Sequence, residues 1–143
     1  MIKNEIPVTI EIETFHQQAN ETEEYTEKVN GKCIQMENVF YLRYTEKQTE
    51  KDALVTFKVV PNKEVQLTRK MEGHKLHLTF DLQKKVVTQY HTPYGNIPIE
   101  IETNLLEIQF DQEKQAGKLA INYQLYNGHD LLGDYKIRLQ FNS

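Results

Sequence analysis

The sequence QYHTPYGNIPIEIET, residues 89–103, holds the clearest structural signals in the chain, and its first half predicts a tight turn. Pro93 fixes its own φ and pushes Thr92 toward an extended conformation. Gly95 tolerates a positive φ, so the order Pro93-Tyr94-Gly95 suits the corners of a β-turn. The chain is therefore expected to reverse its direction here.

The second half of this stretch predicts a strand with one dry face. Ile97, Ile99 and Ile101 fall on every second residue, and the side chains of a strand alternate between its two faces. Pro98 lies on the opposite face and has no N–H to donate, which indicates an edge, a bulge or the start of a strand. Turn and strand together predict a hairpin with one buried and one solvated face.

A period of two recurs along most of the chain, and it predicts about ten strands joined by short turns. The expected strands cover residues 6–13, 25–35, 39–45, 54–60, 65–71, 76–82, 85–91, 97–103, 106–110, 118–126 and 135–141. Asn30-Gly31 suits a hairpin or a bulge, and we favour the bulge because a hairpin would leave two very short arms. The best place for a helical turn is residues 16–24, and the charged residues 46–52 predict a solvated loop.

Each expected strand has one apolar face, and this pattern favours a closed antiparallel meander barrel over a sandwich. Closing the sheet buries all the apolar faces together and removes exposed edges. The predicted fold class is all-β: a barrel of about eight to ten strands with little or no helix, forming one domain over residues 1–143. Large inward residues such as Phe80, Ile99 and Ile121 predict a mostly filled interior with a shallow cup at one end.

Composition and charge limit the kinds of partner. The formal net charge is −4 with acids and bases interspersed, so the sequence offers no cationic surface for a nucleic-acid backbone. No apolar run has the length of a signal sequence or approaches the ~18 residues of a membrane-spanning helix. The single Cys33 excludes an internal disulfide and suits a reducing compartment. We expect a cytoplasmic protein, monomeric or weakly dimeric, that binds neither membranes nor nucleic acids.

A small set of residues, together with the order of the elements, carries a resemblance to a known family. These residues are Arg69, Phe80, Tyr90, Thr92-Pro93-Tyr94-Gly95 and Thr103. They resemble the YwiB-like family of small uncharacterised proteins from Gram-positive bacteria, and the resemblance extends over nearly the whole chain. It implies a calycin-type (lipocalin-like) barrel, and no established activity. One departure is Met71, because members of the family tend to carry a glycine shortly after the arginine and this chain has one only at Gly73.

Arg69 is the most informative charged residue, because strand parity places it with Val65 and Leu67 on the face that points into the barrel. An arginine keeps its proton there, so it needs a carboxylate, carbonyls or water. One interpretation is a structural tether near one end of the barrel, to Glu46 or to a strand carbonyl. The other is an anchor for an anionic ligand, because a guanidinium matches carboxylate and phosphate groups. We prefer the tether.

The candidate ligand-binding residues lie around this arginine and the central turn. They are Arg69, Tyr90, His91, Thr92, Tyr94 and Thr103. Tyrosine suits the ends of a barrel, where its ring is buried and its hydroxyl reaches water, although strand preference accounts for most of the eight tyrosines. A ligand at the barrel mouth is expected to contact Arg69 and Tyr90.

No pattern in the sequence indicates catalysis, a cofactor or a metal. His74 and His77 are three residues apart, which directs them to opposite faces of a strand, and the other histidines are isolated. Cys33 lies among apolar residues of an expected strand, so it suits a packed side chain better than a nucleophile. Paired carboxylates such as Glu100 and Glu102 fall on solvated faces. We expect a protein without enzymatic activity, metal or cofactor.

Two kinds of function remain open. The first is a protein-interaction or scaffold module, whose outer surface or loops contact a partner protein. The second is a barrel that binds a small anionic or partly apolar molecule at its mouth, near Arg69 and Tyr90. Because a mostly filled interior leaves little room for a ligand, the sequence favours the interaction module.

Overall fold

A computed structural model describes residues 3–46 and 52–143, and this part of the chain consists of strands and turns. The strands are β1 (Lys3–Gln18), β2 (Glu21–Met36), β3 (Val39–Glu46), β4 (Ala53–Val60), β5 (Glu64–Met71), β6 (His74–Phe80), β7 (Val86–Thr92), β8 (Gly95–Asp111), β9 (Ala116–Asn127) and β10 (Asp130–Asn142). Most of the solvated loop expected over residues 46–52 lies outside the described residues. Within them, no helix has the length and apolar character to cross a membrane.

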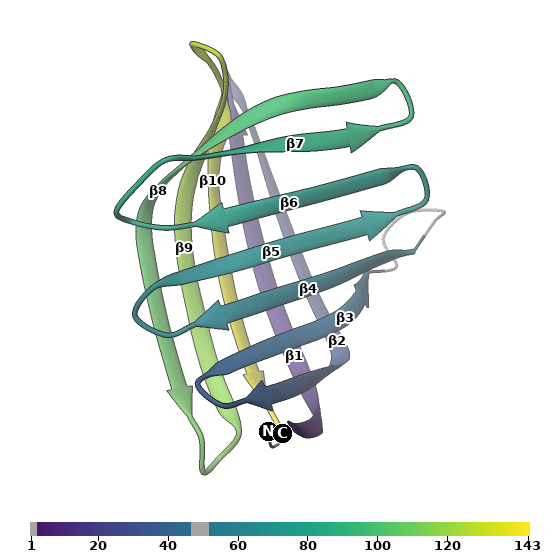
Figure 1. Ribbon diagram of the computed structural model, residues 1–143, viewed down its shortest axis with the longest axis vertical. Helices are drawn as coiled ribbons and strands as arrows, with labels where there is room; N and C mark the ends of the chain where they lie inside the picture. Colours follow the sequence, from purple (N-terminus) through teal and green to yellow (C-terminus); the bar gives the residue numbers. More distant parts are fainter. Residues whose placement is uncertain (1–2, 47–51) are drawn as a thin grey trace.

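The strands form a closed meander barrel (Figure 1). Each strand is antiparallel to the next one along the chain, and β1 completes the ring because it pairs with both β2 and β10. The all-β fold class and the closed antiparallel barrel predicted from the period of two are therefore confirmed.

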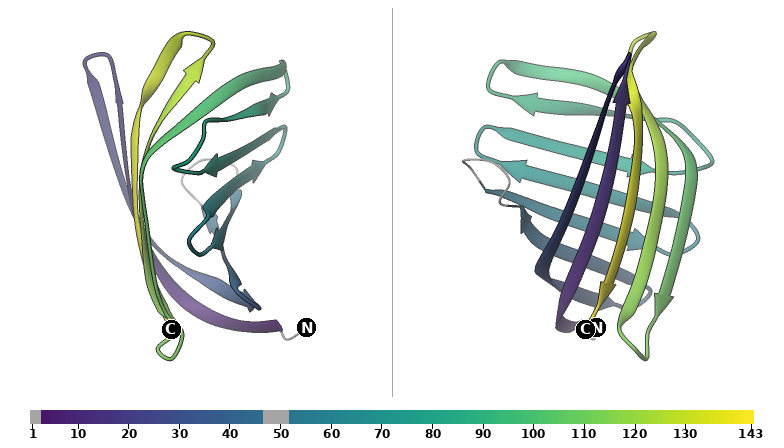
Figure 2. Two further views of the ribbon diagram at one scale, coloured as in Figure 1. Left: turned by 60° about the vertical axis from the view of Figure 1, so that its left-hand side comes forward. Right: turned by 180° about the vertical axis from the view of Figure 1, so that it is seen from behind.

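Two groups of strands cross steeply in this barrel. The long strands β8, β9, β10, β1 and β2 run side by side, and the shorter strands β3 to β7 pass across them (Figure 1 and Figure 2). Crossing brings the inner faces of two twisted sheets together over one core. Completely buried members of this core include Ile10, Leu42, Val59, Ile101 and Ile121.

Three phenylalanines fill one end of the interior, and we call Phe40, Phe110 and Phe141 the aromatic plug. The Phe40 ring stacks on Phe110 with their centres 4.5 Å apart, and its centre lies 5.8 Å from that of Phe141. Gly117 leaves space for the plug, because a Cβ atom there would lie 2.8 Å from the Phe141 ring. Side chains thus occupy this end of the barrel.

The central hairpin forms between β7 and β8, as the sequence predicts. Thr92 Oγ1 accepts a hydrogen bond from the Tyr94 N–H at 3.2 Å and donates one to the Gly95 carbonyl oxygen at 2.7 Å. Gly95 has a φ of 126°, a conformation that side chains rarely allow. The turn therefore uses both the local hydroxyl and the glycine.

The isoleucines after this turn lie on the inner face of β8. Ile99 and Ile101 are buried, whereas Ile97 is 40% exposed. The reason is that β8 pairs with β9 only from Glu100 onward, so the start of β8 has β7 as its one neighbour among the described strands. Pro98 lies in this singly paired segment, which confirms that it marks an edge.

The first hairpin is longer than the sequence predicts. The polar residues 16–24 form no helical turn, because β1 continues to Gln18 and β2 begins at Glu21. A tight turn joins the two strands, and Ala19 adopts a φ of 54° in it. Pairing with β1 and β10 holds these polar residues in extended backbone even though they show no apolar alternation.

The bulge expected at Asn30-Gly31 is also wrong. The register between β1 and β2 runs unbroken through both residues. Glycine is needed for a different reason, since a Cβ atom on Gly31 would collide with the backbone carbonyl oxygen of Arg43. The glycine marks a close approach of β2 and β3.

The two strands expected over residues 97–103 and 106–110 are one strand, β8. Its register with β9 shifts between Thr103 and Leu105, so Asn104 is the extra residue of a bulge. The bulge moves the inward positions from odd numbers such as Ile101 to even numbers such as Leu106. This change of parity is what made one strand look like two.

The end of β6 also differs from the prediction. Leu82 was expected to line the sixth strand, but β6 ends at Phe80 and Leu82 is 50% exposed. Asp81 begins a turn instead, because its Oδ1 accepts a hydrogen bond from the Gln83 N–H at 2.8 Å. The change of direction turns Leu82 out of the core.

The contact between β6 and β7 is unusually slight. Lys75 and His91 form the one residue pair that joins these strands in the described part of the chain, whereas β5 and β6 pair along their whole length. The barrel is therefore closed here mainly by side-chain packing.

Candidate functional site

A polar cup opens at the end of the interior away from the aromatic plug. It has a volume of about 340 Å³, and strands of both groups line it. Along β1, Ile10 pairs with Phe141 of the plug, while His16 pairs with Tyr135 of the cup, roughly 20 Å further along the strand. Glu23, an exposed residue, is part of the lining, so the cup reaches the solvent. This arrangement confirms the expectation of a mostly filled barrel with a cup at one end.

An ion pair between Arg69 of β5 and Glu46 of β3 forms part of the cup wall. Arg69 Nη2 donates to Glu46 Oε1 at 2.9 Å, and Arg69 Nε donates to Glu46 Oε2 at 3.2 Å. This hydrogen bonding raises the pKa of Arg69 above its ordinary value. The side chains are 34% exposed for Arg69 and 12% for Glu46. The tether expected for Arg69 is present, and Glu46 is its partner.

Two tyrosines beside this ion pair stay protonated. Burial, together with the carboxylate of Glu27, raises the pKa of Tyr25, and burial together with Glu46 raises the pKa of Tyr44. The Tyr25 hydroxyl donates a hydrogen bond to Glu27 Oε2 at 2.7 Å. A neutral phenol both donates and accepts hydrogen bonds, so the wall offers polar contacts without adding charge.

A stack of three rings from the long strands forms another wall of the cup. His16 lies parallel to Tyr135 with the ring centres 4.4 Å apart, and Tyr135 lies parallel to Tyr123 at 5.0 Å. Gly133 makes space for the first ring, because a Cβ atom there would lie 2.9 Å from His16 Nε2. Flat, parallel rings give this side of the cup a rigid apolar surface.

Several polar atoms of the cup lack hydrogen bonds. His16 Nε2 is buried without a partner. The hydroxyls of Tyr44, Tyr123 and Tyr135 make no hydrogen bond with any described residue, but unlike His16 Nε2 they are not completely closed off from solvent. A buried polar group without a partner is unfavourable, and native proteins leave few of them. These atoms are therefore the ones that a bound molecule would satisfy.

Three of the residues that the sequence singled out lie inside the barrel. Arg69 lines the cup, and Tyr90 lies near enough to influence its charge electrostatically. Thr103 pairs with Tyr123 across β8 and β9, is 8% exposed and has an unpartnered hydroxyl, but it lies outside the lining of the cup. Of the interior residues named in advance, only Arg69 contacts the cavity directly.

The other three lie on the β7–β8 hairpin and do not line the cup. His91 is exposed, and its Nδ1 lies 2.8 Å from Asn96 Oδ1. Thr92 holds the turn through its hydroxyl, and the Tyr94 side chain is 99% exposed. The structure thus separates these three residues from Arg69.

Sequence reasoning missed the residues that make the cup polar. Tyr123 and Tyr135 were noted as strand tyrosines, but their stacking on His16 brings together three strands that are far apart in the chain. His16 was set aside because it is isolated in the sequence from other histidines and from cysteine. The usable signal was parity, since His16 follows Ile10 and Ile12 on the even-numbered, inward side of β1.

Cys33 and the histidines show no reactive arrangement. Burial raises the pKa of the Cys33 thiol to about 11, so it stays protonated near neutral pH. Over residues 3–46 and 52–143, no group of three His, Cys, Asp or Glu side chains is placed to hold a metal ion.

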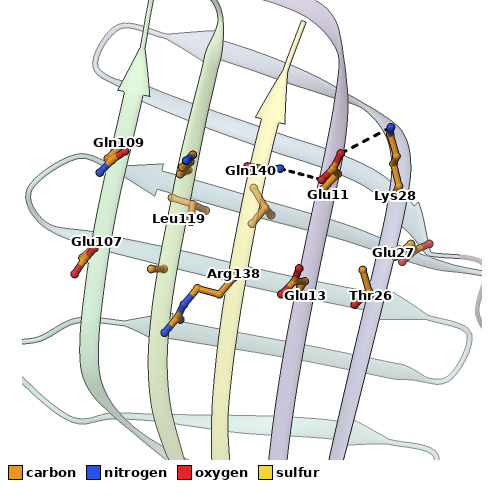
Figure 3. Close-up of a pocket in the computed structure, with 13 residues that line it drawn as sticks. Glu11, Glu13, Thr26, Glu27, Lys28, Glu107, Gln109, Leu119, Arg138 and Gln140 are labelled. Atoms are coloured by element: carbon orange, nitrogen blue, oxygen red, sulfur yellow. Dashed lines mark hydrogen bonds and ion pairs between the residues drawn. The ribbon is translucent and has the colours of Figure 1, made fainter.

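A second hollow, of about 520 Å³, lies on the outer side of the long strands (Figure 3). Lys28 Nζ lies 3.8 Å from Glu11 Oε1, and Gln140 donates a hydrogen bond to Glu11 Oε2 at 2.9 Å. Arg138 donates to the Ile137 carbonyl oxygen at 2.9 Å. Because these polar groups already have partners within the protein, the cup is the better candidate for a binding site.

The fold and the site define a small meander barrel with an aromatic plug at one end and a polar cup at the other. Comparison of sequences then places the chain in a family. It belongs to the DUF1934 family, described as a domain of unknown function, whose model matches residues 10–139. No curated protein matches this chain.

A solved structure agrees with this assignment. The crystal structure of the ywiB protein from Bacillus subtilis superposes with a TM-score of 0.82, covering 97% of this chain and 92% of that chain at 19% sequence identity. Likeness at this identity shows the fold alone. Together with the family match, it confirms the resemblance to the YwiB-like family.

Proposed function

We propose that this protein binds a small, uncharged, partly apolar molecule in the polar cup and does not transform it. The observation that carries the proposal is the buried His16 Nε2, which has no hydrogen-bond partner and lies in the cup beside Tyr123 and Tyr135. A ligand with a flat apolar body and hydrogen-bonding groups at its edge would complement both the ring stack and these atoms.

The charge of the cup favours an uncharged ligand over an anion. Glu46 balances the charge of Arg69 and accepts hydrogen bonds from two of its five N–H groups, so an incoming carboxylate or phosphate gains less from the guanidinium than it would from an unpaired one. An anion in the cup would either lie close to the negative charge of Glu46 or displace it from Arg69 and leave it without a base in a largely buried position. Of the two classes of ligand that the sequence suggested near Arg69, we therefore propose the partly apolar one and not the anionic one.

The size of the cup sets an upper limit on the ligand. Its volume of about 340 Å³ is near the lower end of the range of about 300–1,000 Å³ that ligand sites occupy. The aromatic plug and the packed core occupy the rest of the interior. A molecule of one or two fused rings fits this space better than a long lipid chain.

Binding without catalysis is the simpler proposal. A catalytic cysteine needs an accessible thiolate, and Cys33 is a buried thiol with a raised pKa. The outward carboxylates Glu11 and Glu13 are engaged with, or surrounded by, polar side chains on the outer surface. The single cysteine suits a reducing compartment, so the cytoplasm is the location we propose.

Indole tests the proposal, because it is flat, uncharged and has one N–H donor. We expect indole to shift the NMR signals of the cup residues. Leu76→Trp should abolish this binding, since Leu76 lines the cup and a larger ring would fill it. Val87→Trp is the matched control, because Val87 is exposed on the outer side of β7 and should leave indole binding unchanged.

Native mass spectrometry of the protein purified from its own host complements this test. A small molecule that co-purifies with the unmodified chain but not with Leu76→Trp supports the proposal. Indole shifts that persist in Leu76→Trp, or the absence of both indole shifts and a co-purifying molecule, would overturn it.

A second candidate function is binding to another protein, which the sequence favoured. Its support is a free edge of the sheet along β2, and that edge also indicates which kind of partner fits.

A further inference from the structure

Residues 21–31 of β2 form a free sheet edge, which we call the β2 edge. They pair with β1 on one side, but β3 pairs with β2 only over residues 32–36, and no other described strand takes its place. Figure 2 shows the tip of the β1–β2 hairpin standing apart from the shorter strands. The ring of strands is thus closed near Met36 and open toward the hairpin tip.

Nothing in the β2 edge except charge opposes pairing with a further strand. Its register with β1 is unbroken, and it contains neither proline nor a bulge, two features that usually protect edges. Thr22, Tyr25, Thr26 and Val29 favour extended backbone. Alternate residues of an edge strand present their N–H and C=O groups outward, so backbone donors and acceptors remain for an added strand.

The charge of the β2 edge is strongly acidic. It contains Glu21, Glu23, Glu24 and Glu27 and one base, Lys28. The three glutamates nearest the hairpin tip are exposed. Opposite charges that face each other across strands stabilise pairing, and like charges destabilise it. The edge therefore discriminates in favour of a basic strand.

A groove beside the β2 edge gives an added strand a place to lie. A hollow of about 690 Å³ begins where β3 leaves β2, and Val29, Tyr44 and Leu54 contribute apolar surface to it. At Gly31 the two strands are still close, because a side chain there would collide with the Arg43 carbonyl oxygen, and their pairing ends at the neighbouring pair of Lys32 and Arg43. Beyond Gly31 the two strands separate, and an added strand would continue the sheet in the space that β3 leaves.

We propose that the β2 edge binds an extended, basic segment of a partner protein as an added strand. Its lysine or arginine side chains lie opposite the glutamates of the hairpin tip, because Arg43 makes the closed end of the groove less acidic. A second copy of this chain fits worse, since it brings together two edges that each carry four glutamates and a single lysine. Glu23 and Tyr25 of the β2 edge also line the cup, so the two sites are neighbours, and the tests below follow binding at each of them separately.

Short synthetic peptides test this inference with the full chain. The basic probe alternates lysine with threonine and valine, the acidic probe has glutamate in place of each lysine, and a third probe is the basic peptide N-methylated at every second amide. Calorimetry should detect binding of the basic probe alone, because strand addition needs both the charge and the backbone N–H groups. Amide hydrogens along residues 22–30 should become protected from exchange when it binds.

Charge reversal at the edge supplies the matched variants. Glu21→Lys/Glu24→Lys should weaken binding of the basic probe about tenfold and allow the acidic probe to bind. Neither residue lines the cup, so indole binding should persist and report correct folding. Glu107→Lys/Glu113→Lys makes the same change of charge away from the edge and should leave the affinity for the basic probe unchanged.

Three results of the peptide experiments would overturn the inference. They are equal binding of the N-methylated probe, an equal loss of affinity in the control variant, and no binding of the basic probe. A dimer of the unmodified chain that dissociates in Glu21→Lys/Glu24→Lys would identify a second copy as the occupant and would also overturn it. If the unmodified chain does not bind indole, the ligand proposed for the cup is wrong, and the proposal for the β2 edge is unaffected.

Discussion

The two ends of the barrel interior both consist of aromatic side chains, yet they differ in what those side chains leave unpaired. In the aromatic plug, the rings of Phe40, Phe110 and Phe141 contact one another and contain no polar atom. In the polar cup, the rings of His16, Tyr123 and Tyr135 also stack, but they carry polar atoms at their edges, and one of these, His16 Nε2, is buried without a partner.

This difference shows that aromatic content alone does not locate a binding site. Ring packing stabilises both ends, because each ring removes a large apolar area from water. The polar atoms at the cup add little to folding while they are unpaired, and they become favourable when another molecule satisfies them. Substitutions at the plug should therefore change stability, and substitutions at the cup should change binding.

The largest expected effect is at the plug. Phe40→Ala removes a fully buried ring from contact with two others, and we expect it to lower the free energy of unfolding by about 3–5 kcal/mol. Urea unfolding measures this change. Tyr94→Ala is the control, because that side chain is almost fully exposed and its loss should change stability by less than about 0.5 kcal/mol. Equal effects would show that the plug does not hold the barrel together.

A smaller effect is expected from the ion pair in the cup wall. Arg69→Met leaves the largely buried Glu46 without its partner and should lower stability by about 1–2 kcal/mol, between the values for exposed and buried pairs. Lys85→Met is the matched control, because Lys85 pairs with Glu100 at 3.6 Å in a more exposed setting. The tether interpretation fails if Lys85→Met destabilises the protein as much as Arg69→Met.

His77, which lies outside both the plug and the cup, should make the stability of the fold depend slightly on pH. Burial, together with the nearby Lys75, lowers the pKa of His77 below 6.5, so the unfolded chain binds more protons there than the folded chain. Its contribution is present above pH 6.5 and is lost as pH falls through and below that value. His77→Gln should flatten the dependence of Tm on pH in this window, as thermal unfolding at a series of pH values can measure. If Tm depends on pH equally steeply in His77→Gln and in the unmodified protein, this prediction is wrong.

The smallest effect on stability is expected in the ring stack of the cup. Tyr123→Phe keeps the ring and removes a hydroxyl without a partner, so stability should change by less than about 0.5 kcal/mol. Indole binding, followed by NMR, should nevertheless weaken. Tyr94→Phe, outside the cup, should change neither quantity. A large loss of stability in Tyr123→Phe would mean that the hydroxyl is satisfied within the folded chain.

The fold was predictable because it depends on a local pattern. Alternation at Ile97, Ile99 and Ile101 and at similar positions elsewhere fixes which face of each strand is buried, and closure follows from the need to bury every such face. Prediction from the local pattern of apolar residues failed where pairing with neighbouring strands decides the structure. Residues 16–24 have no apolar alternation but are held in strands by β1, β2 and β10, and Asn104 hides the continuity of β8 by changing parity.

The candidate site was predictable only in part. The alternation of side chains along the strand was sufficient to predict that Arg69 points into the barrel, where Glu46 was one of its expected partners. It could not show that His16, Tyr123 and Tyr135 form one stack, since their contact depends on the register of strands distant in sequence. The hairpin residues His91, Thr92 and Tyr94 were grouped with Arg69 because they are close to Tyr90 in the chain, which says little about distance in a barrel.

The slight joint between β6 and β7 has a consequence for the motions of the molecule. Since Lys75 and His91 supply the one residue pair described there, separating these strands sacrifices few backbone hydrogen bonds. Hydrogen–deuterium exchange should therefore be faster along the β6-facing side of β7 than along β5, whose neighbours pair along its length. Opening at this joint would bring water to the inward side chains of β6 and β7 without unfolding the long strands.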